Sequence, residues 1–219
     1  MLLGAHLILS AYGFWLPNDP RGSWSDFVAS WELLKFGKAT KVSTTRSVAW
    51  VPHDVALRKA AKKSLLHSPV FFNGAQALAI AKGFAQAASE IDLRVHACSI
   101  LPTHAHLIIG AHRASYPSIT RRLKACATRF LREERMDPMQ GRVDGEGAPQ
   151  SPWGSKYWKV FIENQRHLRH AIRYVEQNPL KEGKREQHRS FVVPYPSARL
   201  DAPHKGAAKG IRTMRSIDD

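Results

Sequence analysis

The sequence is poor in cysteine, in acidic side chains and in long apolar stretches. Its 219 residues include two cysteines, Cys98 and Cys126, whose separation does not match a metal site and which suit a reducing, cytoplasmic compartment. No apolar stretch approaches the roughly 20 residues that a membrane-spanning helix needs. The apolar start carries His6 and has no basic segment before it, so we expect a first strand there rather than a signal peptide.

Positive charge is what the sequence has in excess. Lys and Arg outnumber Asp and Glu by 33 to 18, which gives a formal net charge of +15. A field of this sign attracts polyanions, and nucleic acid is the first candidate. An anionic membrane surface would call for a basic amphipathic helix with a clean apolar face, and the sequence contains none. We therefore expect a nucleic-acid partner and no membrane.

Apolar periodicity predicts the order strand, insertion, helix, strand, strand, helix, strand, helix. The predicted strands are 5–15, 93–100, 105–110 and 157–162. The predicted helices are 74–90 with Asn73 as N-cap, 118–134, and one that opens at 164 or 165 and is stopped by Pro179. This βαββαβ order predicts an α+β fold, a ferredoxin-like antiparallel sheet with helices packed on one face.

One domain over residues 1–183 accommodates these elements, with an insertion at about 17–72 after the first strand. The insertion contains Trp24, Trp31 and Trp50, so we expect it to pack on the domain or on a ligand, and its clearest helix covers roughly 54–66. Residues 184–219 are basic and aperiodic, which predicts a disordered tail.

Two imidazoles stand out in the third predicted strand. His104 and His106 are two residues apart in an otherwise apolar stretch, so both side chains point to the same face of the sheet. Such a pair can converge on one metal ion or one phosphate, although an isolated His-x-His pattern is a weak indication. We interpret His6 and His96, on other strands, as packed histidines or as supports for a ligand rather than as ligands.

The last predicted helix carries a polar stripe. His170, Tyr174 and Asn178 are spaced four apart and share one face, which a solvated surface would also explain. Two imidazoles and an amide oxygen can bind a divalent cation, and a cation can polarise a phosphate. A tyrosine with a positive neighbour can then attack that phosphate. His170, one turn before Tyr174, is a hypothetical orienting group or base.

A second basic stripe lies on the helix predicted at 118–134. Four of its cations are candidate phosphate contacts, with a solvated helix face as the alternative: Arg121, Arg122, Lys124 and Arg129. Tyr157 is a rival nucleophile, but it has no polar partner at helical spacing, and we interpret it as a packing or base-stacking residue.

The sequence resembles a known family at three places. Thr103-His104-Ala105-His106-Leu107 resembles the histidine–hydrophobic–histidine (HUH) motif of single-tyrosine HUH transposases. Residues 174–183 are similar to the Tyr-Ile-x-x-Asn-Pro-Val-x-x-Gly helix end of REP-associated tyrosine transposases, in the IS200-like group. Residues 12–22 resemble a Tyr-Gly-Thr-Trp-Leu-Pro segment of a transposase-like branch. Together the resemblance covers residues 5–16 and 73–183.

The resemblance implies an HUH endonuclease with Tyr174 as nucleophile and with His104, His106 and Asn178 as metal ligands. It implies cleavage and rejoining of single-stranded DNA, beside a hairpin or palindrome, through a 5′-phosphotyrosine intermediate. It also implies Mg²⁺ or Mn²⁺ as cofactor, a nucleoid location when on DNA, and a homodimer formed by sheet pairing as one oligomeric state. Two alternatives stay open: a non-catalytic nucleic-acid-binding protein on the same fold, and a metal-dependent hydrolase in which the histidine pair holds Zn²⁺.

Overall fold

An antiparallel sheet organises the protein. The computed structural model describes residues 2–16, 19, 33, 35–37 and 52–195. Its four strands are β1 (Gly4–Ser10), β2 (Val95–Ile100), β3 (His104–Gly110) and β4 (Trp158–Ile162). They are arranged in the order β2-β3-β1-β4, and every neighbouring pair is antiparallel. This is the ferredoxin-like order, so the predicted α+β class is confirmed.

Four helices accompany the sheet in the described residues. They are α2 (Val55–Lys63), α3 (Gly74–Glu90), α4 (Tyr116–Glu133) and α5 (Gln165–Lys181). The start of α3 agrees with the prediction, because the Asn73 side chain accepts from the Gln76 amide while the Gln76 side chain accepts from the Asn73 amide. None of the helices in the described ranges is long and apolar enough to cross a membrane.

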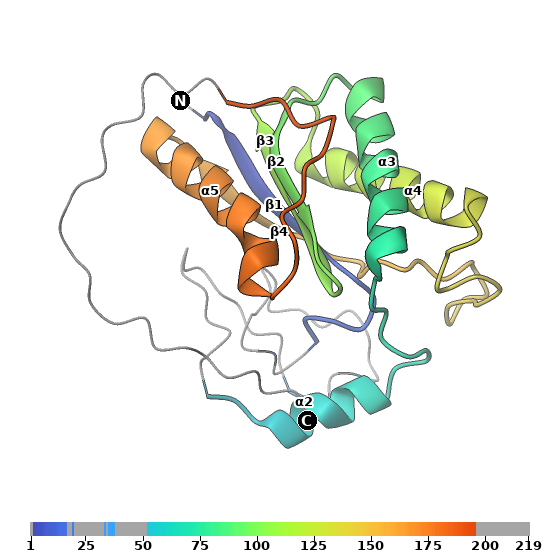
Figure 1. The fold of residues 1–219 in the computed structure, drawn as a ribbon. Helices are drawn as coiled ribbons and strands as arrows, with labels where there is room; N and C mark the ends of the chain where they lie inside the picture. The colour runs from blue at the N-terminus through green and yellow to red at the C-terminus, as the bar shows by residue number, and fades with distance from the viewer. Residues whose placement is uncertain (1, 17–18, 20–32, 34, 38–51, 196–219) are drawn as a thin grey trace.

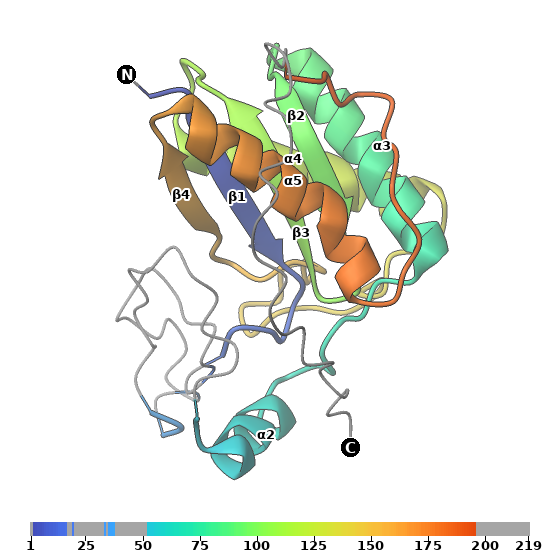
Figure 2. The same ribbon diagram turned by 60° about the vertical axis from the view of Figure 1, so that its left-hand side comes forward.

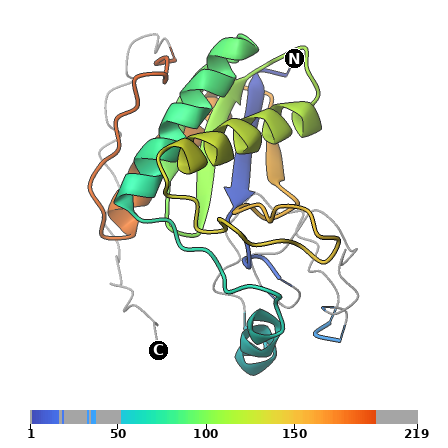
Figure 3. The same cartoon turned by 90° about the vertical axis from the view of Figure 1, so that its right-hand side faces the viewer.

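The helices cover both faces of the sheet, not one. Figure 1 shows the sheet between α5 on one side and α3 with α4 on the other, and Figures 2 and 3 show these two faces in turn. Inward residues of β1 and β3, including Leu7 and Leu107, pack with α3 and α4. On the opposite face, Ile108 and Ile162 pack against α5. The expectation of helices on one face is therefore wrong for α5, because alternate residues of these strands are apolar on both faces.

The end of α5 also differs from the prediction. The helix does not stop at Pro179 but continues to Lys181. Proline in the last turn gives up one backbone hydrogen bond, and the termination is made by Gly183, which has a φ of 66°. The Lys184 amide donates to the Pro179 carbonyl and the Gly183 amide to the Leu180 carbonyl, the bonding pattern of a Schellman cap.

The segment that follows α5, up to residue 195, is ordered, whereas we predicted a disordered tail. Figure 2 shows it returning beside β2. Gln187 accepts from the Ile100 amide and donates to the Ile100 carbonyl, and the Val193 amide donates to the Val95 carbonyl. Residues 187–193, which we call the strap, thus occupy the outer edge of β2. The predicted disorder is wrong for the part up to residue 195, and residues 196–219 lie outside the described part of the chain.

Within the predicted insertion at about 17–72, the structure describes residues 19, 33, 35–37 and 52–72. The first strand is shorter than predicted, because β1 ends at Ser10 and the chain turns at Gly13, whose φ is 83°. Val70 and Phe72 are buried in the main core, as expected for an insertion that packs on the domain. Trp24, Trp31 and Trp50 lie outside the described residues.

Candidate active site

His106 lies at the centre of the site, in the middle of a central strand. It is 3% exposed, and its Nδ1 is 2.8 Å from Nε2 of His6 on β1. In the strand register His106 is opposite Ile8, and His6 is opposite Ile108, so the two histidines are diagonal neighbours on one face. His6, which we expected to be a packed or supporting histidine, therefore contacts the predicted metal ligand directly.

His104 lies at the open end of the same strand. Its ring centroid is 4.6 Å from that of His106, and its Nδ1 is 2.8 Å from the hydroxyl of Thr103. The ring of Trp15 is 6.1 Å away. Trp15 has a φ of 56°, a backbone conformation that residues other than glycine rarely adopt. The two histidines thus sit side by side, as the alternation of strand side chains predicts.

Helix α5 brings Tyr174 onto the same face of the sheet. Leu168, Ala171 and Val175 bury the apolar side of the helix against the sheet. The ring of Tyr174 then lies 5.8 Å from that of His106 and 6.0 Å from that of His6. The structure therefore brings the predicted nucleophile and the predicted metal-binding pair together, although they lie far apart in the sequence.

Polar and charged groups surround Tyr174 on the helix. Asn178 is 8% exposed, and its side-chain amide acts on the phenol to lower the pKa of Tyr174. Lys181 places its Nζ 4.7 Å from the centre of the phenol ring. Burial raises the pKa of Tyr174, the Asn178 hydrogen bond lowers it, and the negative charge of Glu182 raises it. The phenol is consequently harder to ionise than a tyrosine in water.

Burial keeps the two contacting histidines neutral. Desolvation lowers the pKa of His6 to about 4, with a smaller contribution from the nearby positive charge of His167. Desolvation also lowers the pKa of His106 well below its usual value, and His104 and His6 lower it further. Neutral imidazole is the form that binds metals.

One buried atom tests whether a cation fits here. Nε2 of His106 is buried without a hydrogen-bond partner. An orphaned ring nitrogen beside a second imidazole is what a bound cation would satisfy, so the residues fit such a group. Among the described residues no three His, Cys, Asp or Glu side chains form a metal-binding group. Among the described residues, the predicted third ligand is the side-chain amide of Asn178.

Among the described residues, the structure shows no contact that supports the predicted orienting role of His170. His170 is exposed, and within the described residues it makes no hydrogen bond or ring contact. The histidine of α5 that acts electrostatically on the site is His167, through its effect on His6. Its spacing of seven residues from Tyr174 places it on the same helix face, which a search at four-residue spacing misses.

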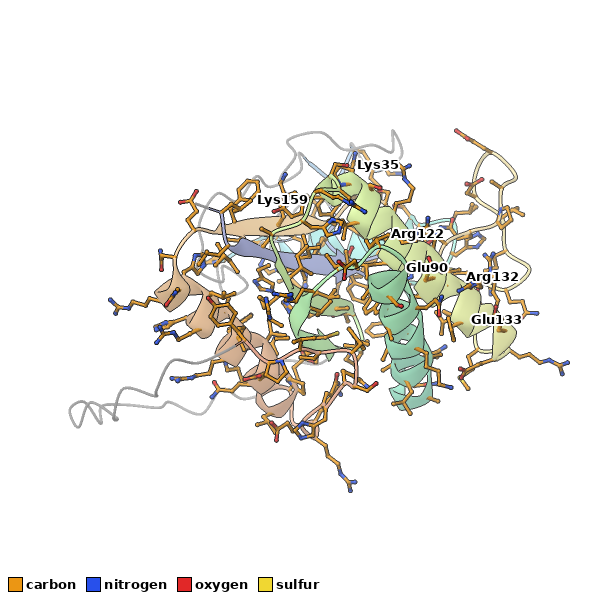
Figure 4. All side chains as sticks on the ribbon, turned by 90° about the horizontal axis from the view of Figure 1, so that it is seen from above. Lys35, Glu90, Arg122, Arg132, Glu133 and Lys159 are labelled. Atoms are coloured by element: carbon orange, nitrogen blue, oxygen red, sulfur yellow. The ribbon has the colours of Figure 1, made fainter. Side chains whose placement is uncertain are left out.

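The four predicted phosphate contacts on α4 fall into different environments. Figure 4 shows Arg122 beside Glu90 of α3, and their side chains form an ion pair at 3.2 Å. Lys124 donates to the backbone carbonyls of Gly154 and Lys156, and burial lowers its pKa to about 8. Arg129 is 3.8 Å from Glu133 in an exposed pair. Arg121 is exposed, and no hydrogen bond or ion pair engages it within the described part of the chain.

A wide groove runs along α4 to the end of the sheet. Arg121, Lys124 and Arg129 line it, whereas Arg122 does not. The groove also reaches Tyr12 and Trp15, whose indole ring lies 6.1 Å from the ring of His104. It thus connects the basic helix with the edge of the histidine pair. Trp153, in contrast, is 2% exposed and packs near Phe72 and Phe84 in the core.

Fold and site together define an α+β domain with a histidine pair and a tyrosine on one sheet face. Among solved structures, the chain is similar to a REP-associated tyrosine transposase bound to a REP hairpin, at 14% identity and a TM-score of 0.42, over 84% of this chain and 70% of that one. It is also similar to a candidate transposase from Deinococcus radiodurans, at 13% identity and a TM-score of 0.36, over 81% of this chain and 91% of that one.

No protein-family model matches the sequence, and no curated protein does.

Proposed function

We propose that the protein is a metal-dependent DNA strand transferase, a transposase or endonuclease of the single-tyrosine HUH type. The observation that carries this proposal is the placement of Tyr174, whose ring lies 5.8 Å from that of His106. A phenol beside two imidazoles can attack a phosphate that lies between the phenol and the imidazole pair. The HUH and Tyr-x-x-x-Asn-Pro patterns that carry these residues support the same function.

Tyr174 is the nucleophile in this proposal. Its Oη forms a bond to the phosphorus of single-stranded DNA while the bond from phosphorus to the 3′ oxygen breaks. The phenol loses its proton to water, which reaches the site because Tyr174 is 39% exposed, and the released 3′ oxygen takes up a proton. The phosphotyrosine keeps the energy of the original ester, so a later 3′ hydroxyl can reverse the step and join strands.

Lys181 supports the attack. The developing phenolate is negative, and the ammonium of Lys181 lies 4.7 Å from the centre of its ring. A cation at this distance stabilises the ring and the charge that forms on it. This favourable contact opposes the effects of burial and of Glu182, both of which raise the pKa of Tyr174.

His104, His106 and Asn178 would hold the metal, through two imidazole nitrogens and an amide oxygen. When bound, Mg²⁺ or Mn²⁺ supplies Lewis-acid polarisation of a phosphate oxygen. The choice of these metals follows from the resemblance, because a pair of imidazoles would also suit Zn²⁺.

The groove along α4 would carry the DNA strand. Arg121 and Arg129 can neutralise phosphates, and Trp15 can stack on a base where the groove meets His104. A hairpin or palindrome beside the cleaved strand is the substrate that the family resemblance suggests.

A covalent-adduct assay tests the function. The full chain is incubated with Mn²⁺ and single-stranded DNA bearing hairpins, taken from palindromes that flank the gene, and is then resolved on a denaturing gel. Wild type is expected to form a protein–DNA adduct, and Tyr174→Phe to form none while still binding DNA. Tyr157→Phe is the matched control, because Tyr157 packs against the main core, and it should keep the adduct.

The two alternative functions, a non-catalytic binding protein and a hydrolase, predict different results in this assay. A wild type that binds DNA but forms no adduct on any hairpin would be a non-catalytic binding protein. Cleavage without an adduct, persisting in Tyr174→Phe, would indicate a hydrolase. Catalytic zinc usually has three protein ligands of the His, Asp, Glu or Cys type. The described residues contain no such group of three.

A further inference from the structure

His6 and His106 contact each other through ring nitrogens, with Nε2 of His6 2.8 Å from Nδ1 of His106. A neutral imidazole has one N–H group and one lone pair, so only one of the two rings can donate here. The direction of donation decides the tautomer of His106. It therefore decides whether Nε2, its other nitrogen, carries a proton or a lone pair.

The two directions are not equivalent in this structure. If His6 donates, Nε2 of His106 keeps its proton, and that N–H is buried with no acceptor. If His106 donates, its Nε2 carries the lone pair and the remaining proton sits on Nδ1 of His6. Among the described residues, Nδ1 of His6 does not belong to the set of buried, unpartnered atoms. The second arrangement avoids the penalty of an unpaired buried donor.

We propose that His6 is a positioning residue that accepts the Nδ1 proton of His106 and so leaves the Nε2 lone pair available to a divalent cation. Metal-binding histidines usually donate their other N–H to a carboxylate, a carbonyl or a water, which fixes the tautomer. Here a second histidine takes that place. This inference rests on the metal site of the proposed function.

The sheet holds the two rings in this relationship. Their strands are neighbours in the centre of the sheet, and each histidine is opposite an isoleucine of the other strand. His104 is engaged through the same ring atom, since its Nδ1 lies 2.8 Å from the Thr103 hydroxyl. Both predicted ligands are thus anchored at Nδ1, by different partners.

NMR spectroscopy of the metal-free, full-length protein tests the tautomer directly. Long-range ¹H–¹⁵N correlations show which ring nitrogen carries the proton, and comparison with His106→Gln assigns the signals. We expect His106 to be protonated at Nδ1 and His6 at Nδ1. A proton on Nε2 of His106 would overturn the inference.

Metal titration tests the consequence with two variants. In His6→Gln the amide oxygen can still accept from His106, whereas His6→Leu leaves no acceptor. With Mn²⁺ alone, followed by electron paramagnetic resonance, we expect His6→Leu to weaken binding about 10–100-fold and His6→Gln to recover most of the loss. His112→Leu removes a histidine that is hydrogen-bonded to Ile91 elsewhere, and it should bind Mn²⁺ as wild type does.

Equal Mn²⁺ affinity of wild type and a folded His6→Leu would contradict the inference. If His6→Leu does not fold, the tautomer measured in wild type still decides the question. Failure of the proposed function looks different. The protein could show the expected tautomer and bind Mn²⁺ but form no adduct through Tyr174. That result would support the role of His6 and contradict the transferase function.

Discussion

At the scale of single residues, the reactivity of Tyr174 depends on opposing neighbours. Burial and the carboxylate of Glu182 raise its pKa, whereas the Asn178 hydrogen bond lowers it. The nucleophile is therefore mostly protonated at neutral pH, and its rate of attack should increase as the pH rises towards that pKa. Charges close to the ring consequently control the rate.

Glu182→Gln removes the negative charge that disfavours the phenolate. The pKa of Tyr174 should fall, so more phenolate is present at any pH below it. We expect faster adduct formation at a fixed alkaline pH and a pH–rate profile displaced to lower pH. Glu186→Gln makes the same charge change in the following segment and should leave the profile in place. An unchanged profile in Glu182→Gln would show that this carboxylate does not reach the phenol.

Lys181→Ala should have the opposite effect. Without the ammonium 4.7 Å from the ring centre, the phenolate loses a stabilising cation, and adduct formation should slow by about 2–5-fold at an exposed site. Lys181→Arg keeps the charge and should retain most of the rate. The check is the initial rate of adduct formation at saturating DNA, where binding differences do not contribute.

At the scale of elements, the contact between α3 and α4 constrains the fold because the two helix backbones approach closely. A Cβ added at Gly83 would lie 2.4 Å from Cα and 2.6 Å from N of Ala127, which are backbone atoms of the facing helix. The two helices can pack at this separation only because Gly83 has no side chain. The contact fixes the layer that supports the sheet on the face opposite the site.

Gly83→Ala should destabilise the protein even though alanine favours helix. Overpacking typically costs about 1–3 kcal/mol, which outweighs a helix-propensity gain of up to about 1 kcal/mol. The free energy of unfolding in urea measures the balance. Gly74→Ala is the matched control, because no atom lies within 4 Å of its added Cβ, and it should be neutral or slightly stabilising. A stabilised Gly83→Ala would mean that the helices separate at little cost.

The two edge strands of the sheet differ in whether another segment covers them. The strap covers the outer edge of β2 through Gln187 and Val193. In the described residues β4 forms the other edge, with β1 as its neighbour. Covering an edge strand blocks pairing with another sheet. A homodimer made by sheet pairing, which stays a prediction, would therefore use β4 unless the strap moves.

At the scale of the whole molecule, the net charge of +15 makes the salt dependence of DNA binding informative. Each phosphate contact on single-stranded DNA contributes about 0.7 to the slope of log K against log salt. Arg121→Ala should reduce the slope by about that amount, because Arg121 lines the groove. Arg122→Ala should leave the slope unchanged, since this guanidinium pairs with Glu90. Equal slopes for Arg121→Ala and Arg122→Ala would show that the DNA does not bind along the groove.

Much of the fold follows from local patterns. Asn73 and the alanine-rich stretch after it specify α3, and short apolar runs specify β2 and β3. Because successive side chains of a strand alternate between the two faces of the sheet, His104 and His106 lie on one face. Less predictable were the limits of β1 and α5. Gly183 rather than Pro179 ends the helix, because a proline in a last turn removes one hydrogen bond without preventing the turn.

The sequence by itself determined the chemical repertoire: a basic chain, two imidazoles on one strand face, and a phenol and an amide on one helix face. Only the tertiary structure decided that α5 covers the face opposite α3 and α4, that His6 contacts His106, and that the strap lines β2. The reason is physical. Periodicity reports the environment along one element, whereas the choice between two apolar sheet faces depends on contacts between segments distant in sequence.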